Sequence, residues 1–155
     1  TLIEAARLAP SCYNKQPWRY LFMESADALE KGRKALAESN FAWASRAPLL
    51  IAVYSRAEDD CELPDGRAYH QFDVGMSAMC LILAATEMGL VARPMAGFEP
   101  GEIRRAFRLD EKDEVILMIA VGKPSSDESH LPKQFKNLAR QPRIRKSAGE
   151  IARRV

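Results

Sequence analysis

The sequence predicts an α+β (mixed α/β) fold in which helices flank one central sheet. Two apolar runs, residues 49–54 and 114–121, have the length and composition of buried strands. Between them, residues 69–88 are almost wholly apolar at helical spacing, which predicts a long helix covered on most of its circumference. Helix-like and strand-like runs alternate along the chain, and the helices carry more residues than the strands. This combination is typical of an α+β domain.

The other regular elements follow from periodicity and from capping residues. A helix is expected over residues 2–8, and the aromatic-rich run 18–23 predicts a strand. Ser25 is a typical N-cap for a helix over residues 28–37. Pro100 suits the first turn of a further short helix.

Three segments have weaker patterns. Residues 41–46 are ambiguous between secondary structures, and residues 55–66 form a charged loop with an Asp-Gly turn. The acidic run 58–60 in that loop is expected to be a solvated surface. Residues 125–155 are polar and basic with little apolar periodicity, so we expect an extended arm and not a second domain.

Composition bounds the class of protein. A chain of 155 residues suits one domain, here 1–155, and a net charge of +2 is too small to indicate nucleic-acid binding. No apolar run reaches the length of about 18 residues that spans a membrane, and no signal peptide is visible. We therefore expect a cytoplasmic protein without a membrane partner.

The reactive residue types are few. The three cysteines, Cys12, Cys61 and Cys80, form no CxxC pair and are interpreted as free thiols of a reducing compartment. His70 and His130 lack ligand-like spacing, so no metal site is expected. The motifs GxxxxGK[ST], GxGxxG, GxSxG and HExxH are absent. A chain with so few residues suited to acid–base catalysis is consistent with an enzyme whose cofactor carries the chemistry. We therefore expect no catalytic side chain.

The segment 9–20 has an unusual concentration of polar turn residues. Ser11, Asn14 and Gln16 lie between two prolines, beside an aromatic residue, where the helix over 2–8 meets the strand over 18–23. Such side chains offer donors and acceptors that could grip a flat, polar, heteroaromatic ligand. An ordinary helix-to-strand loop explains them equally well.

The same segment carries a family resemblance. Its run APSCYNKQPW resembles the Ala-Pro-Ser-x-x-Asn-x-Gln-Pro-Trp segment of the nitroreductase family of FMN-dependent oxidoreductases, and the resemblance continues through MGLVARPMAGF to VGKP. It implies a nitroreductase-like fold with a mainly antiparallel sheet. It also implies a homodimer with the long helix at the interface, FMN as cofactor and NAD(P)H as co-substrate. The helix over 69–88 could equally be a plain core helix.

The resemblance also assigns residues to the flavin ring. In the family, the first loop reaches a flavin bound mainly by the partner subunit; here it supplies Pro10, Ser11, Cys12, Asn14 and Gln16. A turn whose main-chain N–H groups face the ring corresponds to Pro94, Met95, Ala96 and Gly97, although many relatives have Glu in place of Ala96. Asn40 corresponds to an Asn beside the flavin pyrimidine. Without the resemblance, the 94–97 segment is simply a glycine-containing turn.

The phosphate of FMN needs cationic partners. The family's Arg-x-Ser-x-Arg element, which precedes the first helix, is not in the residues given, so Arg143 and Arg145 are expected to carry more of the anchoring. The alternative for this run is a solvated basic tail.

The resulting hypothesis is hydride transfer from NAD(P)H through FMN to a nitroaromatic, a quinone or a similar small acceptor. Alternatives are other flavin chemistry of the family, such as reductive dehalogenation or flavin consumption, and a non-catalytic flavin-binding remnant.

Overall fold

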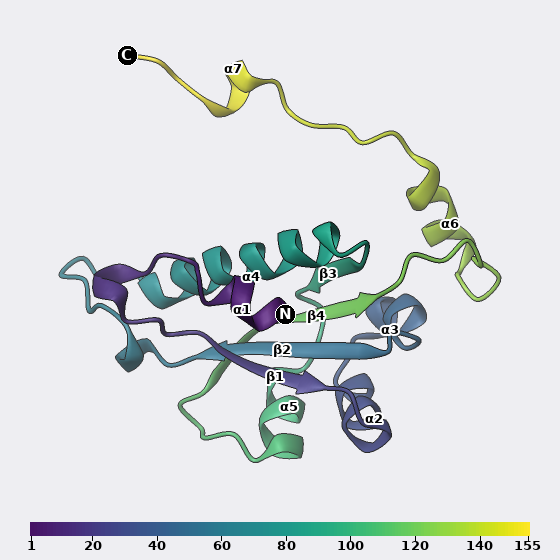
Figure 1. Ribbon diagram of the computed structural model, residues 1–155, viewed down its shortest axis with the longest axis horizontal. Coiled ribbons are helices and arrows are strands. Elements are labelled where there is room, and N and C mark those ends of the chain that lie inside the picture. Colours follow the sequence, from purple (N-terminus) through teal and green to yellow (C-terminus); the bar gives the residue numbers. More distant parts are fainter.

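Four antiparallel strands form the sheet at the centre of the protein (Figure 1). The computed structural model describes residues 1–155, with the exception of the Ala139 side chain. The strand order is β1-β2-β4-β3, so β1 and β3 lie at the edges. The strands are β1 (Arg19–Met23), β2 (Leu49–Ser55), β3 (Val91–Met95) and β4 (Glu114–Gly122). The expected α+β class with a mainly antiparallel sheet is confirmed.

Two hydrophobic clusters lie on opposite faces of the sheet. Because side chains alternate along a strand, neighbouring residues of β2 and β4 belong to different clusters. Leu50 and Met118 face one cluster, whereas Ile51 and Ile119 face the other. Every one of these four side chains is fully buried.

Helices cover both faces (Figure 1). The face that includes Ile51 and Ile119 is covered by two helices, α1 (Leu2–Ala6) and α4 (Tyr69–Glu87). The opposite face is covered by three helices, α2 (Ala26–Lys34), α3 (Glu38–Ala44) and α5 (Pro100–Phe107). The ambiguous segment 41–46 therefore belongs largely to a helix, whose Ala44 is buried in the core.

Local signals explain where several helices begin and end. The Ser25 hydroxyl accepts a hydrogen bond from the Ala28 N–H at 3.2 Å, and Pro100 occupies the first turn of α5. Gly89 follows α4 with φ +71°, a left-handed conformation that glycine adopts readily. These features confirm the expected helix boundaries to within a few residues.

The long helix α4 is only partly covered. Val74, Ala78 and Leu81 are buried against the sheet. The stripe that includes Phe72 and Leu83 lies outward, and the Leu83 side chain is 57% exposed. The helix therefore presents an apolar face that its own chain leaves open.

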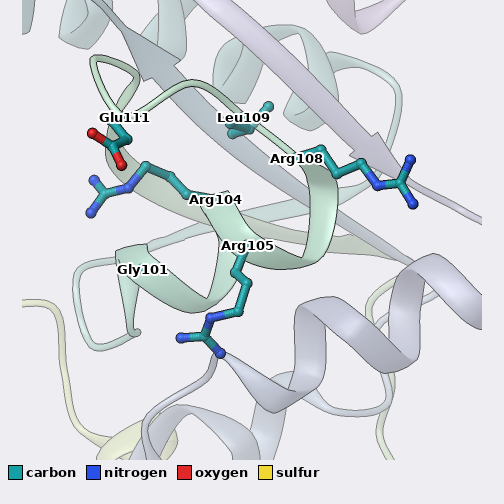
Figure 2. A pocket seen from close by; sticks show the side chains of 6 residues that line it. All are labelled: Gly101, Arg104, Arg105, Arg108, Leu109 and Glu111. Atoms are coloured by element: carbon teal, nitrogen blue, oxygen red, sulfur yellow. The ribbon is translucent and has the colours of Figure 1, made fainter.

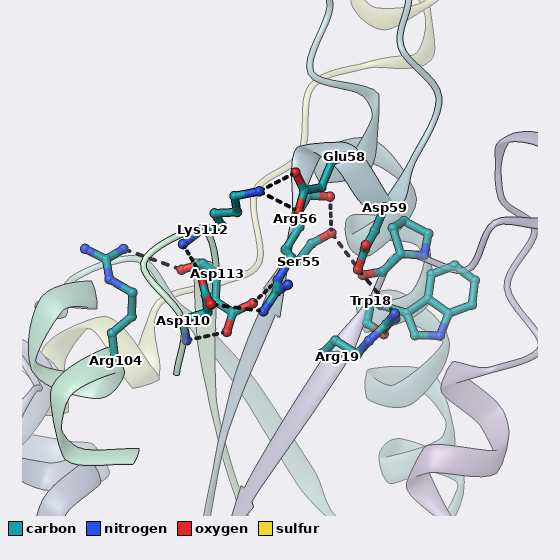
Figure 3. A network of polar contacts seen from close by, with 11 residues as sticks. Trp18, Arg19, Ser55, Arg56, Glu58, Asp59, Arg104, Asp110, Lys112 and Asp113 are labelled. Atoms are coloured by element: carbon teal, nitrogen blue, oxygen red, sulfur yellow. Dashed lines mark hydrogen bonds and ion pairs between the residues drawn. The ribbon is translucent and has the colours of Figure 1, made fainter. Parts of the chain in front are cut away.

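Ion pairs fix the connection between β2 and α4 to the rest of the domain. A short helix, η2 (Ala57–Asp59), carries Glu58, which pairs with Lys112 at 2.9 Å (Figure 3). Asp59 pairs with Arg19 at 3.2 Å. The expectation that the whole run 58–60 is solvated is wrong for Asp60, because the chain turns inward there and only 4% of that residue is exposed.

The C-terminal arm leaves the sheet after β4 and projects away from it (Figure 1). It contains two short helices that its polar sequence did not indicate, α6 (Lys133–Arg140) and α7 (Ala148–Ile151). Residues 141–155 are exposed throughout. Among the described helices, none is both long and apolar enough to cross a membrane.

Candidate functional site

The loop between α1 and β1 adopts a backbone that most residues avoid. It contains the short helix η1 (Cys12–Asn14), and Tyr13, Asn14 and Gln16 have φ of 47°, 57° and 52°. Each such non-glycine residue costs on the order of 1–3 kcal/mol, so the surrounding contacts must hold the loop in place. Strained, polar loops of this kind are typical of ligand sites.

Hydrogen bonds within the loop stabilise this shape. The Ser11 hydroxyl accepts from the Gln16 N–H at 3.0 Å, and the Gln16 side-chain amide donates to the Asn14 carbonyl at 3.0 Å. The Asn14 side chain is exposed. Tyr13 is 92% exposed, so its ring is available for stacking.

Two contacts attach the loop to the rest of the chain. The Cys12 N–H donates to Oδ2 of Asp73 at 2.7 Å, and Cys12 forms a disulfide with Cys61. The expectation of free thiols is therefore wrong for both cysteines and correct for Cys80. The fold brings the Cα atoms of Cys12 and Cys61 to 6.1 Å across a sequence separation of 49, which their spacing could not reveal.

Two buried carboxyl groups lie beneath this attachment. Asp73 is fully buried on α4, and burial raises the pKa of its carboxyl group, an effect that the Cys12 N–H opposes and the neighbouring Asp60 reinforces. An acidic residue within an apolar helix is a recognisable signal that our sequence analysis did not use. Asp60 gave no such signal, because it ends an ordinary acidic run.

A second polar site lies at the end of β3. Neither the Ala96 N–H nor the Gly97 N–H donates a hydrogen bond to any described residue. Met95 points into the core, so only its main chain is available to a ligand. Pro94 precedes it on the exposed edge of the sheet. The turn thus offers backbone donors to a ligand.

Asn40 fixes this turn. Its side-chain amide donates to the Gly97 carbonyl at 2.9 Å, and its Oδ1 accepts from Trp43 Nε1 at 3.2 Å. A Cβ atom on Gly97 would lie 2.8 Å from Asn40 Nδ2, so a larger residue there would displace the amide that holds the turn. The Arg93 guanidinium lies 4.0 Å from the centroid of the Trp43 ring, a cation–π contact that sequence reasoning did not find.

These predicted site residues do not converge within one chain. The 10–16 loop is attached to α4, on one face of the sheet. Asn40 and the 94–97 turn are associated with the helices of the opposite face. Arg143 and Arg145 are exposed on the projecting arm (Figure 1).

Polar networks hold the elements that support both sites. The Ser77 hydroxyl donates to the Ala6 carbonyl at 2.9 Å and bonds the Tyr20 hydroxyl at 2.7 Å, which ties α1 to α4 and β1. Burial raises the pKa of Tyr20 to about 12. Just beyond the C-terminal end of β2, Arg56 Nε donates to Asp113 at 2.7 Å and holds the pKa of that carboxyl below its usual value (Figure 3).

A surface hollow of about 560 Å³ on α5 is lined by three arginines (Figure 2). The side chains of Arg104, Arg105 and Arg108 point in different directions. Arg105 is moreover paired with Glu102 at 2.9 Å. The three guanidinium groups do not converge on one anion, so this hollow is not assigned to the flavin phosphate.

The fold places the chain in a class of oxidoreductases. A solved structure described as an oxidoreductase containing FMN superposes with a TM-score of 0.84 at 29% identity, over 97% of this chain and 77% of that one. A nitroreductase family protein from Clostridium difficile superposes with a TM-score of 0.78 at 27% identity, over 98% of this chain and 81% of that one.

Sequence comparison defines the family. Residues 1–123 match the model of the nitroreductase family. A Streptomyces coelicolor protein with the provisional name NADH dehydrogenase/NAD(P)H nitroreductase is 31% identical over 79% of this chain and 69% of its own length. A Xanthomonas oryzae protein with the same provisional name is 32% identical over 80% of this chain and 73% of its own length. The chain therefore belongs to the nitroreductase family and is an oxidoreductase.

Proposed function

We propose that the chain is a single FMN-binding domain that oxidises NAD(P)H and reduces a nitroaromatic, a quinone or a similar small conjugated acceptor. The observation that carries this proposal is the turn after β3, where the N–H groups of Ala96 and Gly97 have no acceptor in the part of the chain that the structure describes. Hydrogen-bond donors at such a turn suit the electronegative edge of a flavin ring. Bound FMN would supply the hydride- and electron-transfer chemistry, and the residues of this chain would bind and orient it.

The donor set of the chain fits this cofactor. The Ala96–Gly97 turn supplies main-chain donors, and Asn40 holds it rigid through the Gly97 carbonyl. The exposed amide of Asn14 can serve the pyrimidine edge of the ring, with the other polar residues of its loop. Arg143 and Arg145 can form charged hydrogen bonds with the phosphate.

A second copy of the chain is required to bring these groups together. The 10–16 loop and the Gly97 turn belong to opposite faces of the sheet, so in a homodimer the loop of one subunit would complete the site of the other. The apolar face of α4, which includes Phe72 and Leu83, supplies a surface that such a partner would bury. The projecting arm would bring its arginines to the partner's site.

The oligomeric state tests this arrangement. The variant Leu83→Glu places a charge on the exposed stripe and is expected to convert dimers to monomers in light scattering at micromolar concentration. The matched control is Val91→Glu on β3, which is similarly exposed but lies outside both the α4 stripe and the arm. A wild-type protein that is monomeric at this concentration would contradict the two-chain site.

The activity is tested by spectroscopy. We expect purified protein to show flavin absorbance that bleaches under anaerobic NADH or NADPH and returns when a quinone or nitroaromatic is added. The same proposal places the protein in the cytoplasm, where the nicotinamide co-substrates are available, and fractionation checks this. Protein that remains colourless after FMN addition would refute the enzyme and favour a remnant without cofactor. Bleaching that only a halogenated aromatic reverses would favour reductive dehalogenation.

A further inference from the structure

A cluster of sulfur and carboxylate ligands lies where the 10–16 loop meets the connection between β2 and α4, away from the Gly97 turn. Cys12 comes from η1, while Asp60 and Cys61 come from the connection between β2 and α4. One ligand atom from each of the three residues lies within 4.8 Å of the other two. Residues 49 positions apart in the sequence therefore meet in one small volume.

Asp60 points to a missing partner in this cluster. Only 4% of the residue is exposed, and neither of its carboxylate oxygens has a hydrogen-bond partner among the described residues. Lys15 Nζ donates to the main-chain carbonyl of Asp60 at 3.3 Å and not to its carboxylate. A buried carboxylate without a donor is costly, so a proton or a cation must compensate it.

Asp73 adds a second buried carboxyl group next to this cluster. It is fully buried, and among the described residues its Oδ1 has no hydrogen-bond partner. Its other oxygen holds the Cys12 N–H. Asp73 therefore acts as a positioning residue that orients one cysteine of the cluster and adds negative charge behind it.

We propose that Cys12, Cys61 and Asp60 form a Zn²⁺ site in the reduced protein, with water in the fourth position. Two thiolates and one carboxylate are ligands that zinc prefers, and three protein ligands with an open fourth position are a common zinc arrangement. The sequence gave no metal signal because the expectation depended on histidine spacing. Cys12 lies in the loop proposed to contact FMN, but the tests of this site measure metal content and thiol labelling, which do not depend on oxidoreductase activity.

The disulfide and the metal exclude each other, because both use the same sulfur atoms. A dithiol reductant supplies two electrons and two protons, the S–S bond breaks, and the reductant becomes a disulfide. Zinc binding then displaces both thiol protons and forms two Zn–S bonds. A reducing compartment, where thiols stay reduced, would favour the metal-bound form.

Direct metal measurement tests the site. Protein is reduced with a phosphine or a dithiol, desalted anaerobically, mixed with Zn²⁺ and desalted again. We expect one zinc per chain in reduced protein and none in oxidised protein. Co²⁺ in place of Zn²⁺ should give a thiolate-to-cobalt charge-transfer band. Reduced protein without stoichiometric zinc, or a cobalt spectrum without that band, would overturn the proposal and leave a shared proton between the carboxyl groups as the explanation.

Matched variants identify the ligands. Asp60→Asn keeps both cysteines and should weaken zinc binding by at least roughly 10- to 100-fold. Asp59→Asn, one residue away and paired with Arg19, should leave it unchanged. Equal zinc affinity for the two variants would refute the assignment of Asp60.

Alkylation mapping gives a readout that does not depend on any variant folding. In reduced wild-type protein, zinc should protect Cys12 and Cys61 from an alkylating reagent and leave the labelling of Cys80 unchanged. Equal protection of all three cysteines, or of none, would show that zinc does not bind through this pair.

Discussion

Removal of the disulfide is expected to destabilise the domain by an amount that follows from the position of the bridge. Cys12 and Cys61 are 49 positions apart, so the bridge closes a long loop in the unfolded chain. The chain-entropy relation gives roughly 4 kcal/mol of unfolding free energy for a loop of this length. For a domain of this size, that corresponds to a fall in Tm of roughly 8–16 °C.

The assay is urea unfolding of the apo protein at a fixed protein concentration, with a chelator present so that metal cannot replace the bridge. Wild type is compared with the double variant Cys12→Ser/Cys61→Ser. The variant should have a lower midpoint and an m-value that is not smaller, because its unfolded state exposes more surface. Cys80→Ser is the control, since Cys80 is unbridged.

Two results would refute this reasoning. A loss of less than about 1 kcal/mol in the double variant would mean that the bridge is unformed in solution or that strain cancels its benefit. An equal loss in Cys80→Ser would mean that hydroxyl-for-thiol replacement in packed surroundings, and not the cross-link, causes the change.

Three further predictions concern single contacts. Asn40→Ala removes two hydrogen bonds and should cost roughly 1–3 kcal/mol, with a smaller FMN-induced rise in Tm than wild type shows. Arg56 lowers the pKa of Asp113, so this pair stabilises the domain above the ordinary carboxyl pKa and loses its effect as the pH falls through the lowered pKa. In urea titrations, Asp113→Asn should therefore lose less unfolding free energy on acidification than wild type. Arg143→Ala/Arg145→Ala should weaken FMN but not riboflavin, by roughly 1.5–3 kcal/mol for each charged hydrogen bond lost.

Each of these has a contrary outcome. An Asn40→Ala protein with a lower apo Tm but an unchanged FMN increment would make Asn40 purely structural. An acid profile of Asp113→Asn parallel to that of wild type would mean that the Arg56 pair does not govern this part of the titration. Equal loss of FMN and riboflavin binding in the double arginine variant would place the phosphate elsewhere.

The layers of this fold were predictable from the sequence, because buried strands and helices have runs of apolar residues that can be recognised locally. The runs 49–54 and 114–121 are apolar on both faces, and both proved to be interior strands flanked on each side by a hydrophobic cluster. The helix over residues 69–88 was equally predictable from its composition. The helical part of residues 41–46 was not predictable, because that helix is short and is fixed by the packing of Ala44 and by the Asn40–Trp43 hydrogen bond.

The candidate site was only partly predictable for a related reason. The polar loop and the Gly97 turn each have a local sequence pattern, whereas the contacts that hold them do not. The Cys12–Cys61 bridge and the hydrogen bond from Asn40 to Gly97 join segments about 50 or more positions apart. The burial of Asp60 depends on how the chain turns inward. Such contacts follow from the assembled fold, not from spacing in the sequence.

The edge position of β3 restricts how two chains can associate. β3 is paired on one side only, and its Pro94 has no N–H to donate to an added strand. Extension of the sheet across this edge is therefore disfavoured. The main-chain groups next to Pro94 consequently stay accessible to a small molecule instead of being used for chain-to-chain pairing.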